Sequence, residues 1–64
     1  MTLHHKKCQS NGGATNSRNC VEIMQFLHNS WHNLFRNYQP DQIAQVINET
    51  YLDPDYYFVC IKKG

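Results

Sequence analysis

Two histidines, His28 and His32, stand four residues apart within residues 20–38, CVEIMQFLHNSWHNLFRNY. Residues with this spacing share one face of a helix, and imidazole nitrogen is a common zinc ligand. A structural zinc site needs about four ligands, generally drawn from two short chelating pairs. Because His5 and Cys8 form a second pair, one candidate zinc site consists of His5, Cys8, His28 and His32.

A second candidate zinc set combines Cys8 and Cys20 with His28 and His32. Both sets recruit a loosely held N-terminal arm, and neither has the ligand spacing of a zinc finger. On the helix that we predict, the two histidines border the apolar stripe, where a ring commonly packs and turns one nitrogen to water or to a carbonyl. We therefore expect both histidines to flank a packing stripe, with no metal and no cofactor.

Cysteine-based catalysis requires a base within hydrogen-bond reach of the thiol. On the predicted helix Cys20 and His28 are eight residues apart, which places them about 12 Å apart along the axis. Cys60 stands in an apolar segment, where thiols are normally inert. The acidic residues are scattered singly, so we predict that the protein is not an enzyme.

The chain has 64 residues, enough for one small domain. A single core of this size gives about 3–5 kcal/mol unless disulfides, a metal or a second subunit add to it. Its three cysteines cannot all pair internally. The residues after Met1 are polar, and no run approaches the roughly 20 apolar residues of a membrane span. We expect a cytoplasmic protein with free thiols and no membrane association.

Residues 1–18 are predicted to form a flexible N-terminal arm and a Gly/Ser/Asn linker, and residues 19–64 the folded domain. Within this domain, a first helix is expected to begin at Asn19, which suits an N-cap, with Glu22 completing a capping box. Apolar residues then recur at helical spacing: Cys20, Met24, Leu27, Trp31, Leu34 and Tyr38.

A second helix is expected to begin at Pro40, whose fixed φ suits the first helical turn, with Asp41 near the positive end of the helix dipole. The link between the helices is too short for anything but a sharp turn, so the helices should pack as a hairpin or at a steep angle. After the turn signal at residues 53–55, YYFVCI is aromatic and β-branched and predicts a strand.

A lone strand leaves backbone groups unpaired, so this strand should pair with the N-terminal arm or with a second subunit. The predicted fold class is therefore α+β, a two-helix hairpin followed by a C-terminal β-strand. Two short helices and one strand can hardly cover all the large aromatic side chains. We expect six of them to form a partner or oligomer interface: Trp31, Phe35, Tyr38, Tyr56, Tyr57 and Phe58.

The sequence thus favours a small protein–protein interaction or regulatory module that forms a homo-oligomer and docks on a larger protein, whose identity the sequence does not give. One alternative is a zinc-stapled mini-domain. Another is a helix-turn-helix-like nucleic-acid binder in which Gln42, Gln45 and Asn48 contact adenine edges.

The net charge of +1 and a second helix without Lys or Arg weigh against nucleic-acid binding. If the two ends of the chain meet, four lysines would form one basic patch: Lys6, Lys7, Lys62 and Lys63.

Overall fold

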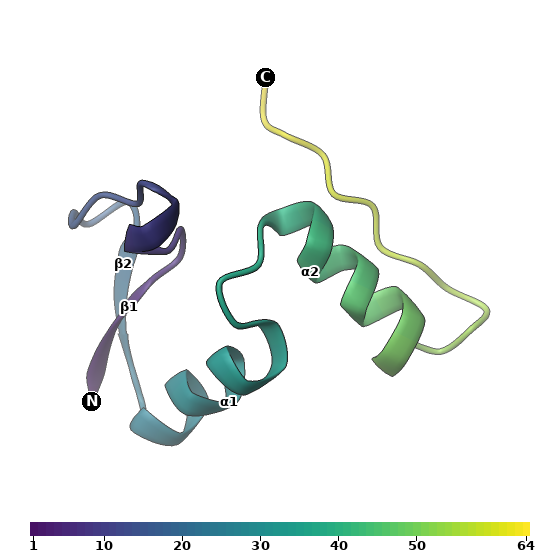
Figure 1. Cartoon of the computed structure of the whole chain (residues 1–64), viewed down its shortest axis with the longest axis horizontal. Coiled ribbons are helices and arrows are strands. Elements are labelled where there is room, and N and C mark those ends of the chain that lie inside the picture. The colour runs from purple at the N-terminus through teal and green to yellow at the C-terminus, as the bar shows by residue number, and fades with distance from the viewer.

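The computed structural model describes all 64 residues. An antiparallel hairpin comes first, in which β1 (Thr2–His5) pairs with β2 (Cys20–Ile23). Helix α1 (Gln25–Phe35) follows, and α2 (Pro40–Val46) continues into a π-helix, η2 (Ile47–Tyr51). A single 3-10 turn, η1 (Gln9–Asn11), lies in the hairpin loop, and the C-terminal residues run extended (Figure 1).

The α+β composition agrees with the prediction, but the predicted arrangement of a helical hairpin followed by a C-terminal strand is wrong. The sheet lies at the N-terminus, where β1 pairs with β2 and with no other segment. Helix α1 makes its principal contacts with β1, while α2 mainly contacts the π-helix that continues it. The two helices therefore do not form a packed pair (Figure 1).

The first helix begins at Gln25 and not near Asn19 as predicted. Residues 20–23 include the β-branched Val21 and Ile23, which favour a strand. Their backbone groups pair with β1, and Glu22, expected in a capping box, lies opposite Leu3 in the ladder. The tertiary pairing thus overrides the helical spacing of the apolar residues over this stretch.

Asn19, expected as an N-cap, instead closes the hairpin loop. Its side-chain oxygen accepts a hydrogen bond from the Lys7 backbone N–H at 2.8 Å, and its amide nitrogen donates to the Lys7 carbonyl at 3.0 Å. The same nitrogen donates to the Ala14 carbonyl at 2.8 Å. A side chain here supplies the paired donor and acceptor that a strand residue would supply.

The Gly12-Gly13 pair, expected in a flexible linker, occupies two restricted positions in this loop. Gly12 has a φ of 86°, which favours glycine. A Cβ atom on Gly13 would overlap the backbone carbonyl of Lys7. Residues 1–18 thus contain a strand and a loop. In this loop the backbone at Gly13 lies too close to the backbone of Lys7 to leave room for a side chain.

The predicted start of the second helix at Pro40 is confirmed, as is the sharp turn before it. The Gln39 backbone N–H donates to the side-chain oxygen of Gln42 at 3.0 Å, which caps the first turn. In the preceding link, Arg36 has φ 49° and ψ −128°, and the Tyr38 N–H donates to the Phe35 carbonyl at 2.9 Å. These values describe a type II′ turn, in which glycine is the usual residue at the position of Arg36.

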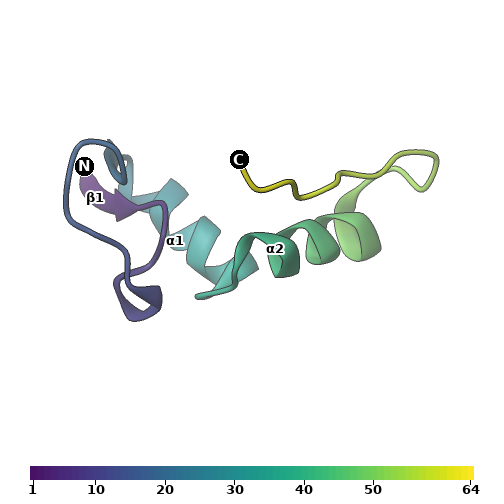
Figure 2. The same cartoon turned by 90° about the horizontal axis from the view of Figure 1, so that it is seen from above.

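The predicted C-terminal strand is also wrong, because the segment from Tyr56 pairs with neither the N-terminal arm nor another strand. After a turn at residues 53–55, the chain returns alongside α2 (Figures 1 and 2). The side chain of Asn48 donates to the Phe58 carbonyl and accepts from the Phe58 N–H, both at 2.8 Å. One asparagine side chain thus takes the place of a partner strand.

Little of the chain is buried. Phe35 and His4 are the two buried residues, 7 % and 8 % exposed. The radius of gyration is 12.9 Å, against about 10.7 Å for a compact chain of this length. The molecule measures 36 × 31 × 17 Å, so it forms a flat body with its small interior between α1 and β1. No helix is both long enough and apolar enough to cross a bilayer.

Candidate functional site

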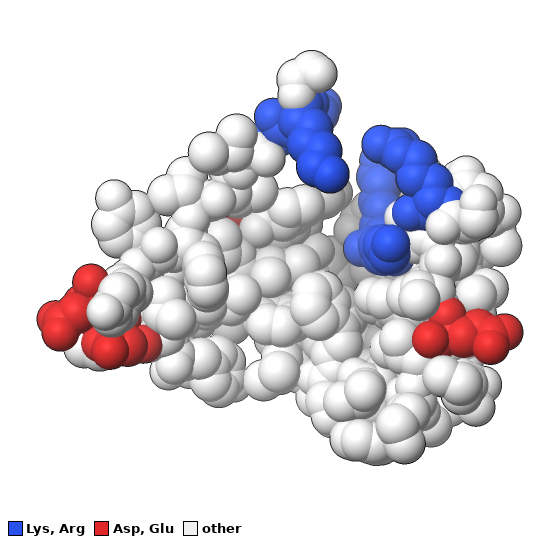
Figure 3. All heavy atoms as spheres, turned by 180° about the vertical axis from the view of Figure 1, so that it is seen from behind, with Lys and Arg blue, Asp and Glu red and all other residues white.

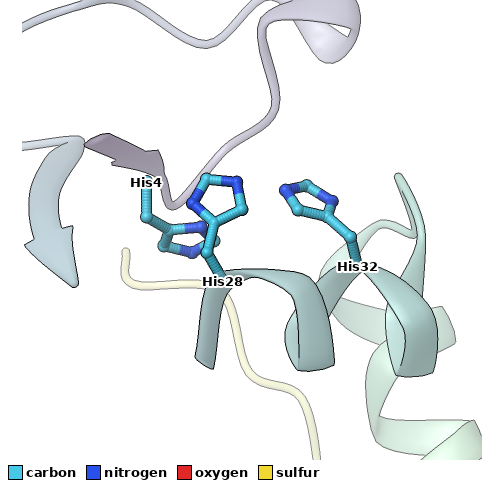
Figure 4. A group of neighbouring side chains, drawn as sticks. All are labelled: His4, His28 and His32. Atoms are coloured by element: carbon cyan, nitrogen blue, oxygen red, sulfur yellow. The ribbon is translucent and has the colours of Figure 1, made fainter. Parts of the chain in front are cut away.

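The face of β1 that meets α1 carries Thr2 and His4, because alternate residues of a strand point to the same side. The Thr2 hydroxyl lies 3.1 Å from Nδ1 of His28. The His4 ring packs edge-on against His28 and Trp31, with centroid separations of 5.4 and 5.6 Å. Strand and helix are therefore joined mainly through imidazole rings (Figure 4).

His28 and His32 lie one helical turn apart on α1, and their ring centroids are 4.7 Å apart. A nitrogen of each ring points toward the other ring (Figure 4). The His4 ring lies beside them, 6.1 Å from His32 between centroids. One ligand atom from each of the three residues lies within 4.8 Å of the other two. We call His4, His28 and His32 the three-histidine cluster.

His4 is the buried member of the cluster, and its Nδ1 has no hydrogen-bond partner. Burial lowers the pKa of His4 below 6.5, because an imidazolium loses hydration there. The charges that neighbouring residues carry lower it further: His28, His32, His5 and Lys6. The lowered pKa favours the neutral His4 ring, in which one nitrogen lone pair can accept a hydrogen bond or bind a metal ion.

The six aromatic residues predicted as an interface fall into two groups. Phe35 is buried, and the half-buried Trp31 packs against it at 4.6 Å between ring centroids and also against His4. Tyr38 is half-buried between the helices. The other three lie on the extended C-terminal segment and are 69 %, 76 % and 57 % exposed: Tyr56, Tyr57 and Phe58.

Of the candidate zinc residues, His28 and His32 lie in the three-histidine cluster, and His4, not singled out from sequence, joins them. His5 and Cys8 line a pocket of about 420 Å³ that also borders His28 and His32. Nε2 of His5 lies 3.0 Å from the Thr15 hydroxyl. The period of two along residues 2–5 would have indicated His4, once that stretch was known to be a strand.

Two of the three cysteines lie in other elements than the sequence predicted. Cys20 lies on β2 and not on the first helix, and its Sγ lies 3.7 Å from the Ala14 carbonyl. Cys60 is exposed on the C-terminal segment and not set in a strand. All three cysteines are free.

Both ends of the chain contribute lysines to one groove of about 640 Å³. Lys6 and Lys7 line it from the hairpin side and Lys62 from the C-terminal segment, with Lys63 next along the chain. Figure 3 shows the basic side chains gathered on two sides of a hollow, with most of the visible acidic atoms lying away from them. The wall of the groove also includes apolar residues and Asp41.

Comparisons with protein-family models, curated proteins and solved structures return no match for this chain. Two features of the molecule nevertheless suit the binding of a partner or a ligand. One is the exposed aromatic segment that Asn48 holds against α2. The other is the three-histidine cluster between β1 and α1.

Proposed function

We propose that this protein is a small non-enzymatic interaction module that self-associates and docks on a larger protein through exposed aromatic and apolar side chains. The observation that carries the proposal is the balance of burial. A single apolar side chain, Phe35, is buried, whereas thirteen large ones are exposed: Met1, Leu3, Val21, Met24, Phe26, Leu27, Leu34, Tyr51, Tyr56, Tyr57, Phe58, Val59 and Ile61.

The accessible surface supports self-association quantitatively. The chain exposes 5385 Å², whereas a compact monomer of its 7.6 kDa exposes about 4,300 Å². The excess of about 1,100 Å² is close to the roughly 800 Å² that each partner buries in a stable interface. A second copy of the chain could therefore cover the surplus, and the small net charge of +1 opposes this little.

We assign the contact with a second copy to the C-terminal segment, which is exposed and held in one position. Tyr56, Tyr57 and Phe58 present three adjacent aromatic side chains, and tyrosine is a frequent binding anchor. The two hydrogen bonds between Asn48 and the Phe58 backbone hold this segment in place before binding. Fixing the segment in advance reduces the conformational entropy lost on association.

A second group of exposed apolar residues lies on the hairpin and at the start of α1, on the other side of the molecule from the C-terminal segment (Figure 1). We assign this group to the larger partner, which leaves the aromatic segment for the second copy. The group consists of Leu3, Val21, Met24, Phe26 and Leu27.

Nucleic-acid binding is the weaker alternative, although Lys6, Lys7 and Lys62 share one groove. The amides expected to contact bases have partners within the chain. Gln42 accepts from the Gln39 N–H, and Gln45 donates to Glu49 at 3.3 Å. Asn48 uses both its donor and its acceptor on Phe58. Reading DNA through α2 would require these bonds to break.

The module suits a reducing compartment such as the cytoplasm. Cys60 is exposed on the segment that we assign to self-association, and Cys8 and Cys20 are also free. In an oxidising compartment an exposed thiol at this position would cross-link copies of the chain covalently.

Sedimentation velocity of the reduced, untagged protein tests the proposal. We expect a dimer or larger assembly at micromolar concentration that dissociates on dilution and changes little with salt. Tyr57→Ser should weaken it at least tenfold, because the substitution removes a central apolar contact.

Tyr51→Ser is the matched control, since Tyr51 is 60 % exposed but lies on the π-helix, outside the aromatic segment. It should leave the assembly intact. A wild-type chain that sediments as a monomer at 100-fold higher concentration would refute the proposal. Binding to duplex DNA that falls steeply with salt would instead favour the nucleic-acid alternative.

A further inference from the structure

We propose that His4, His28 and His32 bind one Zn²⁺ ion per chain, with a water molecule from the adjoining pocket as the fourth ligand. The site joins strand β1 to helix α1, the two elements that enclose the small interior. This inference is independent of self-association, because none of the three residues lies on the exposed aromatic segment.

The donor set fits zinc. Three imidazole nitrogens with an open fourth position form a recurrent zinc arrangement, whereas Mg²⁺ and Ca²⁺ prefer oxygen ligands. The pocket of about 420 Å³ that borders His28 and His32 gives water access to the fourth position. Zinc ligands from a strand and from two positions of one helix approach the ion from different directions, as tetrahedral coordination requires.

The distances require a small closure of the cluster. Its ligand atoms lie within 4.8 Å of one another, whereas tetrahedral coordination with Zn–N bonds of about 2.0–2.1 Å brings nitrogens to about 3.3 Å apart. His28 and His32 are only half-buried. We expect side-chain rotation toward the buried His4, mainly that of His32, to supply this closure, because Thr2 already holds the His28 ring.

The unpartnered Nδ1 of His4 is a second, independent observation. His4 is 8 % exposed, and this nitrogen is shielded from solvent without a hydrogen-bond partner. A buried polar atom without a partner is unusual in a folded protein and calls for an explanation such as a bound ion. A zinc ion among the three rings would give this nitrogen its partner.

The contact between Thr2 and His28 orients one ligand. With Nδ1–H of His28 donating to the Thr2 hydroxyl oxygen, 3.1 Å away, the lone pair stays on Nε2. Metal-bound histidines commonly hold their second nitrogen in this way, which fixes both tautomer and ring direction. In Figure 4 the other nitrogen of His28 accordingly points toward His32.

Competition titration with a chromophoric zinc chelator, on metal-free full-length protein kept reduced, tests the site. We expect one Zn²⁺ per chain and a higher melting temperature with zinc, because the ion binds only the folded arrangement. His32→Gln should weaken zinc binding at least tenfold. His5→Gln is the matched control, since His5 borders the same pocket but lies outside the three-histidine cluster, and it should leave the affinity unchanged.

Absence of zinc binding by the wild-type chain would overturn the proposal, as would an equal loss of affinity in His5→Gln. Circular dichroism establishes that each variant is folded. If His32→Gln does not fold, the visible spectrum of the wild-type protein with Co²⁺ decides. Intense four-coordinate bands without a thiolate charge-transfer band support the three-histidine cluster. A six-coordinate spectrum or a thiolate band contradicts it.

Discussion

His4 joins β1 to α1 in the small interior, because its ring packs against His28, Trp31 and His32 of the helix. The sequence predicted His28 and His32 as a spatial pair from their spacing alone, since that spacing is a local property of a helix. His4 could not be predicted in the same way. Its position depends on the pairing of residues 2–5 with residues 20–23, which are far away in sequence.

The lowered pKa of His4 predicts how the stability of the metal-free protein depends on pH. Folding lowers this pKa below the unfolded value of 6.5, so the native state binds fewer protons and the free energy of unfolding increases with pH in that window. The contribution of His4 is fully present above pH 6.5 and is lost as the pH falls below it. Urea unfolding at pH 7.5 and pH 5.5, with a chelator present, measures the difference.

His4→Gln should reduce this pH dependence, because a neutral amide does not titrate. The neighbouring side chains whose charge acts on His4 are His28 and His32 on α1, with His5 and Lys6 along its own segment. A pH dependence that is unchanged in a folded His4→Gln variant would contradict the prediction.

Arg36 carries backbone strain in the turn between the helices, with a positive φ of 49° that glycine adopts without cost. Arg36→Gly should therefore stabilise the protein by about 1 kcal/mol, since relief of strain exceeds the entropy that glycine gains in the unfolded chain. Thermal unfolding followed by circular dichroism measures the effect. Asn37→Gly, at the neighbouring position without positive φ, should destabilise the protein instead.

Among the elements, the C-terminal segment depends most on one side chain. Asn48→Ala removes both hydrogen bonds to the Phe58 backbone, at a cost of about 1–2 kcal/mol to the docking of this segment. We expect the Phe58 amide to exchange with deuterium at least tenfold faster, as measured by NMR. Asn29→Ala is the control, because the Asn29 side chain bonds within α1 to Gln25. An unchanged Phe58 exchange rate would contradict the role of Asn48.

Local sequence signals predicted some elements correctly and others wrongly. Pro40 and Asp41 predicted the start of α2 correctly, because both act within a single helical turn. The spacing of Cys20 and Met24 continued a helical pattern, but residues 20–23 pair with β1 and leave the helix to begin at Gln25. The segment from Tyr56 has strand composition, yet Asn48 satisfies its backbone at Phe58, a contact that composition does not reveal.

At the scale of the whole molecule, the chain has more large apolar side chains than its own interior can bury. Only two residues are buried, and the accessible surface is 5385 Å². The sequence predicted this surplus from the number of aromatic residues. It did not predict how the residues divide, with Phe35 buried, Trp31 half-buried against it and the C-terminal aromatic residues exposed. That division follows from the hairpin covering one side of α1, a long-range arrangement.

Native mass spectrometry of the untagged, reduced chain over a dilution series tests the central claim most directly, because it counts the chains in each assembly. At tens of micromolar, we predict a dimer or a larger assembly as the main species, with monomers appearing only on dilution. A spectrum of monomers alone over the whole series would contradict the claim that the exposed aromatic segment binds a second copy.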